Sequence, residues 1–156
     1  MEQDTVQWVE KLNDLIAVDI DAAHAYRACI DRLRSAEIKQ RLGAFQQDHE
    51  RHIRELSAYV TRFGGKPRSR SDIKGFILKG FTAVTSMVGD EAALKAMQGN
   101  EQITNHSYKA SLEAAWPDDL RQLIARNYGD EQRHLAYIRE ALQNRAWEKH
   151  EPVQHA

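Results

Sequence analysis

The sequence contains little that would cross-link the chain or interrupt a helix. Cys29 is the only cysteine among 156 residues, which excludes an internal disulfide and any rubredoxin-type or Cys-based zinc site. Three prolines and eight glycines leave long stretches without a helix breaker. Much of the remainder is Ala, Glu, Lys, Leu, Gln and Arg, a composition that favours helix.

Neither charge nor hydropathy points to a nucleic acid or a membrane as a partner. The 22 basic and 23 acidic residues give a formal net charge of -1, so no electrostatic attraction to polyanions is expected. No apolar run approaches the roughly 18 residues of a membrane span. The first residues, Met1 to Asp4, lack the apolar region of a signal peptide. We therefore expect a soluble, cytoplasmic protein.

The hydrophobic pattern predicts one all-α domain over residues 1–148, with a flexible tail at 149–156. The expected helices span about 5–33, 36–63, 90–115 and 117–143. Ser35 is a suitable N-cap for the second helix, and Gly64-Gly65, with Pro67 just beyond, is a suitable stop. These four helices predict a four-helix bundle.

The long crossover between the second and third helices contains a short extra helix at about 72–88. Large apolar residues recur there at helical spacing, from Ile73 and Phe76 to Phe81 and Met87. Two interpretations stay open: this helix covers one side of the bundle core, or it forms the interface of a homodimer.

The second half of the chain repeats the first at an offset of 82 residues. The matched pairs are Asp19 with Glu101, His24 with His106, Tyr26 with Tyr108, Asp48 with Asp130, Arg51 with Arg133, and His52 with His134. A shared offset across two helix pairs predicts two related hairpins packed with approximate two-fold symmetry. Whatever the repeated polar residues do, they do twice.

Six ionisable residues fall on the apolar faces of these helices. Successive residues of an α-helix are about 100° apart. At this spacing, six ionisable residues fall on the apolar stripes that are expected to be buried: Asp19, His49, His52, Glu101, Glu131 and His134. An unpaired buried charge is unfavourable, and no Lys or Arg lies at the centre of the stripes. We expect divalent cations to supply the positive charge; the alternative is a buried polar network without metal.

Glu131 and His134 form a Glu-x-x-His pair, which directs both side chains into a bundle. Ferritin-like di-iron and di-manganese proteins use one carboxylate from each of two helices and a Glu-x-x-His from each of the other two. The separation from Asp19 to His52 is 33 residues, and that from Glu101 to His134 is also 33. The chain departs from the pattern at His49, where the usual residue is Glu, and at Asp19, which is shorter than Glu. Asp48 or Glu55 could supply the missing carboxylate. The alternatives to a di-iron pair are that only one metal binds tightly or that manganese or zinc replaces iron.

The segments Leu12-Asn13-Asp14-Leu15-Ile16 and Phe63-Gly64-Gly65-Lys66-Pro67 resemble a bacterial family of ferritin-like four-helix proteins of unassigned function. Together with the ligand pattern, this resemblance implies a non-haem dinuclear metal protein, with two iron ions or with manganese or zinc. Such a protein would react with O2 or hydrogen peroxide, as a rubrerythrin-like oxidase or peroxidase or as a ferroxidase.

An external donor would supply electrons to such a centre, because the chain has no rubredoxin-like cysteine pairs. Tyr26 and Tyr108 are the candidate catalytic residues, as hydrogen-bond donors or one-electron sources beside the metals; the plainer interpretation is that they fill the core. The alternative function is that of a metal-free structural or stress-response bundle that acts through protein–protein interaction.

Overall fold

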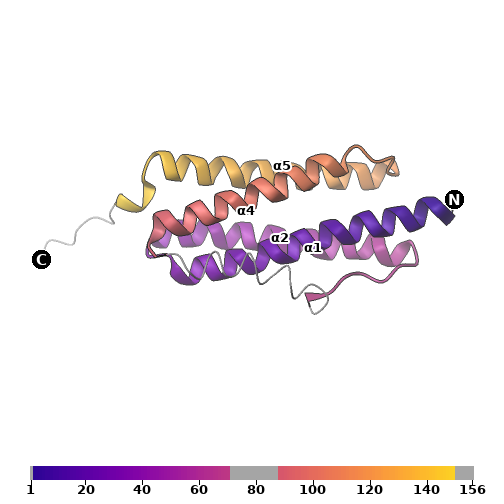
Figure 1. The fold of residues 1–156 in the computed structure, drawn as a ribbon, viewed down its shortest axis with the longest axis horizontal. Helices are drawn as coiled ribbons and strands as arrows, with labels where there is room; N and C mark the ends of the chain where they lie inside the picture. Colours follow the sequence, from indigo (N-terminus) through magenta and orange to yellow (C-terminus); the bar gives the residue numbers. More distant parts are fainter. Residues whose placement is uncertain (1, 71–87, 150–156) are drawn as a thin grey trace, which may run out of the picture.

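The computed structural model describes residues 2–70 and 88–149 (Figure 1). The four long helices are α1 (Glu2–Arg32), α2 (Ala36–Arg62), α4 (Asp90–Ser111) and α5 (Asp118–Gln143), and a short 3-10 helix, η2 (Ala146–Glu148), follows. Within the described ranges there is no strand. The predicted all-α four-helix bundle is confirmed.

The two hairpins predicted from the repeat lie side by side along the long axis of the molecule (Figure 1). Helix α1 packs on α2, and α4 packs on α5, while α1 and α4 join the two pairs. No helix in the described part of the chain combines the length and apolar character that a membrane crossing requires.

The expected crossover helix at 72–88 lies outside the described residues, apart from the exposed Val88. The homodimer interface assigned to that helix therefore stays a prediction. Of the expected tail at 149–156, residues 150–156 also lie outside the described residues.

The first turn between helices is fixed by side-chain caps. Ser35 accepts a hydrogen bond at Oγ from the backbone N–H of Ile38 (3.3 Å), as its position in the sequence suggested. Asp90, at the start of α4, accepts the backbone N–H groups of Arg34 (2.7 Å) and Ser35 (3.0 Å). One carboxylate thus ties the beginning of the second hairpin to the turn of the first.

Helix α4 ends at Ser111, several residues before the expected end near 115. Side chains take up the carbonyl groups at this end: Trp116 Nε1–H donates to the Ser111 carbonyl (2.7 Å), and the Arg121 guanidinium donates to that of Leu112 (2.8 Å). These bonds satisfy carbonyl groups that would otherwise need N–H donors from a further helical turn. The chain can therefore leave the helix early and turn into α5.

The two segments that carry the family resemblance contact each other. Asn13 donates to the Lys66 carbonyl (3.1 Å) and accepts the backbone N–H of Arg68 (2.9 Å). Helix α2 ends in a Schellman motif, in which Gly64 has a φ of 81° and Gly65 N–H donates to the Val60 carbonyl (2.9 Å). This turn therefore folds back onto α1 and is clamped there.

Two apolar blocks fill the core, one at each end of the bundle. One block includes Tyr26, Cys29, Leu42, Phe45, Met97 and Ile138. The other includes Leu12, Ile16, Leu56, Tyr108, Leu120 and Ile124. The six ionisable residues predicted to point inward lie at the level between the two blocks. The fold thus surrounds a polar layer with apolar packing on both sides.

Gly65 gives a test of the clamp between α2 and α1. A Cβ built on Gly65 would lie 2.6 Å from Val9 Cγ1 and 3.1 Å from Val60 Cγ1, whereas one on Gly43, within α2, would meet nothing within 4 Å. We expect Gly65→Ala to lower the free energy of unfolding by about 1–3 kcal/mol through overpacking. Gly43→Ala should raise it by about 0.5–1 kcal/mol through helix propensity. Urea denaturation of both variants checks this; an equal effect of the two substitutions would refute the steric argument.

Candidate metal centre

All six ionisable residues predicted to face inward are completely buried, and they meet at one level of the bundle. We call this set the polar layer; it consists of Asp19 from α1, His49 and His52 from α2, Glu101 from α4, and Glu131 and His134 from α5. Two overlapping groups in it could each hold a metal ion, because the ligand atoms within each group lie within 4.8 Å of one another. His49 and Glu131 belong to both groups.

The first group consists of Asp19, His49, His52 and Glu131. Asp19 Oδ1 lies 2.8 Å from His49 Nδ1 and 3.1 Å from His52 Nδ1. Glu131 Oε1 lies 3.3 Å from the same nitrogen of His52. Two imidazoles and two carboxylates therefore converge here from three helices.

The second group consists of His49, Glu101, Glu131 and His134. Glu101 Oε1 lies 3.2 Å from His49 Nε2 and 3.3 Å from His134 Nδ1. Glu131 Oε2 lies 3.6 Å from His134 Nδ1. The opposite oxygens of Glu131 thus face the two groups, as a carboxylate that bridges two metals requires.

Asp48 and Asp130 hold the outer nitrogens of two histidines across the bundle. His52 Nε2 lies 2.9 Å from Asp130 Oδ2, and His134 Nε2 lies 2.8 Å from Asp48 Oδ2. Each carboxylate comes from the other hairpin, so the pairing is crossed and follows the approximate two-fold symmetry. In metal sites, a ligating imidazole commonly donates its other N–H to a carboxylate in this way. That arrangement leaves Nδ1 of both histidines facing the centre.

Arg51 and Arg133 complete this arrangement at its edge. The Arg51 guanidinium binds Asp130, and the Arg133 guanidinium lies 3.2 Å from Asp48 Oδ2 and 2.8 Å from Asp130 Oδ1. We call these two aspartates and two arginines the outer ring. The ring neutralises the aspartates without placing a cation inside the polar layer.

The two tyrosines that repeat at the offset of 82 bind carboxylates of the polar layer, again in a crossed manner. Tyr26 O–H on α1 donates to Glu101 Oε1 on α4, and Tyr108 O–H on α4 donates to Asp19 Oδ2 on α1 (2.5 Å). Burial and the neighbouring carboxylates, Glu101 and Asp19 respectively, raise the pKa of both phenols well above 10. Both therefore remain protonated donors at neutral pH.

The residues beside the polar layer break its symmetry. Thr104 Oγ1 lies 2.9 Å from Glu101 Oε2 and 3.1 Å from Glu131 Oε2, whereas its counterpart in the first hairpin is Ala22. Phe45 stacks on His134, with ring centroids 4.2 Å apart, whereas its counterpart is Asn127. Neither polar side-chain atom of the buried Asn127 has a hydrogen-bond partner among the described residues.

Three polar residues near the polar layer, Thr104, Asn105 and Asn127, make different contacts. Thr104 contacts two carboxylates of the polar layer. Asn105 Nδ2 instead donates to the backbone carbonyls of Glu101 (2.8 Å) and Glu131 (3.0 Å), so it links α4 to α5. Asn127 contacts no ligand through a hydrogen bond.

The imidazoles of the polar layer favour their protonated form. Burial lowers the pKa of His52, but Asp19 and Asp130 outweigh burial and raise it to about 11. Burial also lowers the pKa of His134, but the contacts with carboxylates, above all with Asp48, outweigh burial and raise it to about 9. The pKa of His49 is also raised well above its ordinary value, because Glu131 and Asp19 outweigh burial.

These shifts correct one part of the sequence argument. Divalent metal ions are not the only source of positive charge that can balance Asp19, Glu101 and Glu131. Three protonated imidazoles also balance the three carboxylates. The same groups can be neutralised by divalent cations, which would displace the imidazole protons.

One structural observation, independent of the sequence pattern, indicates that the polar layer could hold a pair of metal ions. Glu131 Oε1 and His134 Nδ1 are completely buried and make no hydrogen bond among the described residues, although Glu131 Oε1 lies 3.3 Å from His52 Nδ1 and His134 Nδ1 lies 3.3 Å from Glu101 Oε1. Buried polar atoms of this kind are rare, and both are of types that coordinate iron, manganese and zinc. One of these atoms faces the first group and the other faces the second.

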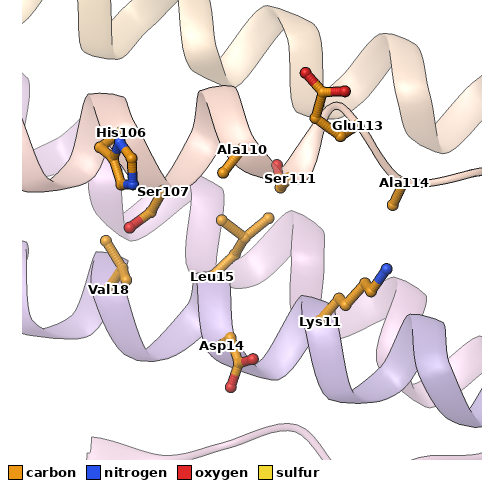
Figure 2. A pocket seen from close by; sticks show the side chains of 10 residues that line it. All are labelled: Lys11, Asp14, Leu15, Val18, His106, Ser107, Ala110, Ser111, Glu113 and Ala114. Carbon is orange, nitrogen blue, oxygen red and sulfur yellow. The ribbon is translucent and has the colours of Figure 1, made fainter.

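A hollow on the described surface is separate from the polar layer. It is a groove of about 440 Å³ between α1 and α4, lined by Leu15, Val18, His106, Ser111 and Glu113 among others (Figure 2). His106 lies in this groove and is exposed. No residue of the polar layer lines it.

Sequence reasoning missed the roles of Asp48, Asp130, Arg51 and Arg133. It considered Asp48 and Glu55 as possible replacement ligands on α2. Asp48 holds His134 instead, and Glu55 pairs with Arg51 (3.3 Å). The signal was available, because both Asp and both Arg recur at the offset of 82 residues. Their position at the edge of the stripe concealed that they reach across to the opposite hairpin.

A family model described as a domain of unknown function (DUF2383) matches residues 7–114, more than half of the chain. This family has a helical fold of the ferritin-like type. The match includes Asp19, His49, His52 and Glu101 and ends before α5, which carries Glu131 and His134. No curated protein matches the chain.

Asp21 gives a pH-dependent test of the burial described here. It is 8% exposed on α1, its Oδ1 has no hydrogen-bond partner among the described residues, and burial raises its pKa to about 6 despite Asn100. The unfolded state, with a pKa near 3.8, loses this proton first. Wild-type stability therefore falls as pH rises from about 4 through 6.

We expect Asp21→Asn to stabilise the protein at pH 7 by on the order of 2 kcal/mol, and most of this gain should vanish near pH 4. Urea denaturation at both pH values checks it. Asp14→Asn, at an exposed position on the same helix, is the control and should shift stability by less than about 0.5 kcal/mol. A loss of stability at pH 7 would mean that the ionised Asp21 is favourably paired.

Proposed function

The chain belongs to the DUF2383 family, and we propose that this member is a non-haem dinuclear metal protein, with iron as the metal, that reacts with O2 or hydrogen peroxide. The observation that carries the proposal is the pair of overlapping ligand groups, buried and joined through Glu131. The crossed carboxylate–histidine contacts of Asp130 and Asp48 add to it, because they present Nδ1 of each histidine to the centre.

The ligands divide between two metal positions. Asp19 and His52 belong to the first, and Glu101 and His134 belong to the second, while His49 and Glu131 lie within reach of both. Carboxylate oxygen and imidazole nitrogen together suit iron, manganese and zinc. Iron is the metal proposed, because a pair of such ions held by histidines and carboxylates in a bundle is the arrangement of the ferritin-like di-iron proteins.

Two ferrous ions in these positions would supply two electrons, which together with two protons reduce hydrogen peroxide to two molecules of water. The chain's own residues prepare the site for that reaction. The apolar blocks around Tyr26 and Tyr108 exclude water. The two phenols hold Glu101 and Asp19 in place and carry protons next to them. Cys29 is the only cysteine, so the chain has no rubredoxin-like cysteine pairs. Electrons to reduce the oxidised metals again would come from an external donor.

Metal uptake by this site would compete with protons. The raised pKa values of His52 and His134, about 11 and about 9, mean that both imidazoles must lose a proton before they bind a metal. Lower pH should therefore weaken metal binding. Rubrerythrin-like and ferroxidase activities both begin with binding of ferrous ions. Both should therefore weaken at lower pH for the same reason.

A metal-free structural or stress-response bundle is the second candidate, and a specific observation favours it. Asp19 contacts His49 and His52 at 2.8 and 3.1 Å, and Glu101 contacts His49 at 3.2 Å. With protonated imidazoles, the polar layer is charge-balanced and nearly all of its atoms are paired. Such a protein would act through a partner protein and would keep its fold without metal.

The two candidates predict different results for metal content. Protein reconstituted anaerobically with Fe²⁺ and then desalted should retain close to two ions per chain, measured by elemental analysis. We expect Glu101→Ala and His134→Ala to lose at least one of the two ions, because each removes a ligand of the second position. His106→Ala, which changes an exposed histidine on α4, is the control and should retain both. Wild-type protein that folds normally but retains no iron, manganese or zinc would support the metal-free candidate instead.

The oxidant can be identified with the same iron-loaded protein. Single-turnover oxidation followed by absorbance should be faster with stoichiometric hydrogen peroxide than with O2 for a peroxidase, and the reverse for an oxidase or ferroxidase. Size-exclusion chromatography of the same sample shows whether the chain assembles into a cage that could store iron.

The outer ring gives a separate prediction. Asp130→Asn removes the carboxylate that orients His52, and Asp48→Asn removes the one that orients His134. Each substitution should weaken metal affinity by about 10–100-fold, measured by competition with a chromophoric chelator. Asp119→Asn, which changes an exposed carboxylate bound to Tyr59, should leave affinity unchanged. Unaltered affinity in both outer-ring variants would show that these contacts serve stability alone.

A further inference from the structure

His49 occupies the one ligand position at which the two hairpins differ in chemistry. At an offset of 82 residues, the carboxylates Asp19 and Glu101 correspond, and the imidazoles His52 and His134 correspond, but His49 corresponds to Glu131. Resting on the function proposed above, we propose that His49 makes the two metal positions unequal. The position of Asp19, His49 and His52 then fills first and tightly, and the position of Glu101 and His134 fills second and weakly.

The first step of the argument is that the ring of His49 lies between the two groups. Its Nδ1 is 2.8 Å from Asp19 Oδ1, and its Nε2 is 3.2 Å from Glu101 Oε1. A neutral imidazole has only one nitrogen with a free lone pair, so it coordinates one metal. Coordination through both nitrogens would need a fully deprotonated ring, and the ring would hold the ions farther apart than the about 3.5–4 Å of a typical two-metal site.

The second step is that Glu131 does not have this restriction. Its Oε1 lies 3.3 Å from His52 Nδ1 in the first group, and its Oε2 lies 3.6 Å from His134 Nδ1 in the second. A carboxylate can bind one metal through each oxygen. Glu131 can therefore contribute one oxygen to each position, whereas His49 can contribute a nitrogen to only one of them.

The third step identifies which position His49 serves. Nδ1 is the nitrogen closer to a carboxylate, and it also lies 3.4 Å from Glu131 Oε1, the oxygen that faces the first group. His52 Nδ1 lies beside the same Asp19 oxygen at 3.1 Å. The first position therefore gathers two imidazoles and two carboxylate oxygens, which is a complete set of four ligands.

The second position is left with fewer donors. Without His49, its protein ligands are Glu101, His134 and the shared Glu131. Thr104 Oγ1 lies 2.9 Å from Glu101 Oε2 and 3.1 Å from Glu131 Oε2, so its single O–H can donate to one of these oxygens at a time. Three protein ligands leave coordination open, as in metal sites that accept an external ligand. The second position is therefore the one that would exchange its metal and receive O2 or peroxide.

The test is a metal titration that does not depend on activity. Metal-free protein is titrated with Zn²⁺ against a competing chromophoric chelator, and the experiment is repeated with Co²⁺, whose visible absorption is strong when four ligands surround it tetrahedrally. We expect two binding steps whose dissociation constants differ by at least tenfold. The first equivalent of Co²⁺ should produce the strong absorption, and the second should add little.

Four variants assign the steps. His52→Ala should remove the tight step, whereas His134→Ala should remove the weak step and leave the tight constant within threefold of wild type. His49→Glu restores a carboxylate at the position that corresponds to Glu131, so the two constants should come within about threefold of each other. His106→Ala is the control and should leave both steps unchanged. Circular dichroism of each metal-free variant establishes that it is folded.

Each outcome bears on a different claim. Two steps of equal affinity in the wild type, an unaltered ratio in His49→Glu, or loss of the tight step in His134→Ala would overturn the inference and leave the metal centre itself in place. Failure of Zn²⁺, Co²⁺ and Fe²⁺ alike to bind the folded wild-type protein would overturn the proposed function, and the inference with it.

Discussion

The exclusion of water from Asp19, Glu101 and Glu131 is the constraint on which the middle of this bundle depends. A carboxylate that is completely buried must meet a positive charge or lose its own. The chain meets this requirement with His49, His52 and His134 at the same level. The two apolar blocks above and below then keep the electrostatic interactions in a medium of low dielectric constant, where each is stronger than in water.

The crossed contacts extend that constraint to the assembly of the two hairpins. Each hairpin carries an aspartate that needs the histidine of the other, and a tyrosine that needs the carboxylate of the other. Helices α2 and α5 approach each other less closely than the remaining neighbouring pairs, so side chains of the polar layer and outer ring bridge the space between them. The polar centre is thus part of what joins the halves, and altering one half disturbs ligands on the other.

Helix periodicity was sufficient to predict the fold and to bring six distant residues to one point, because each long helix has one apolar stripe and an ionisable residue on that stripe must face the others. Periodicity gives the angle of a side chain around its own helix and not its reach. Asp48 and Asp130 lie at the edges of their stripes, so their contacts with histidines across the bundle could not be read from angles alone. Nor could the sequence show which nitrogen of His49 faces Asp19, or that protonated imidazoles suffice to balance the layer.

The approximate two-fold relation between the hairpins has a consequence for how unequal the centre can become. If each hairpin were a separate chain and two identical copies paired, every residue would be present twice, and the position held by His49 would be the same in both copies as that held by Glu131. The centre of such an assembly would be confined to equivalent halves. Covalent joining of the hairpins frees each copy of the motif to change alone, so an imidazole on α2 can face a carboxylate on α5.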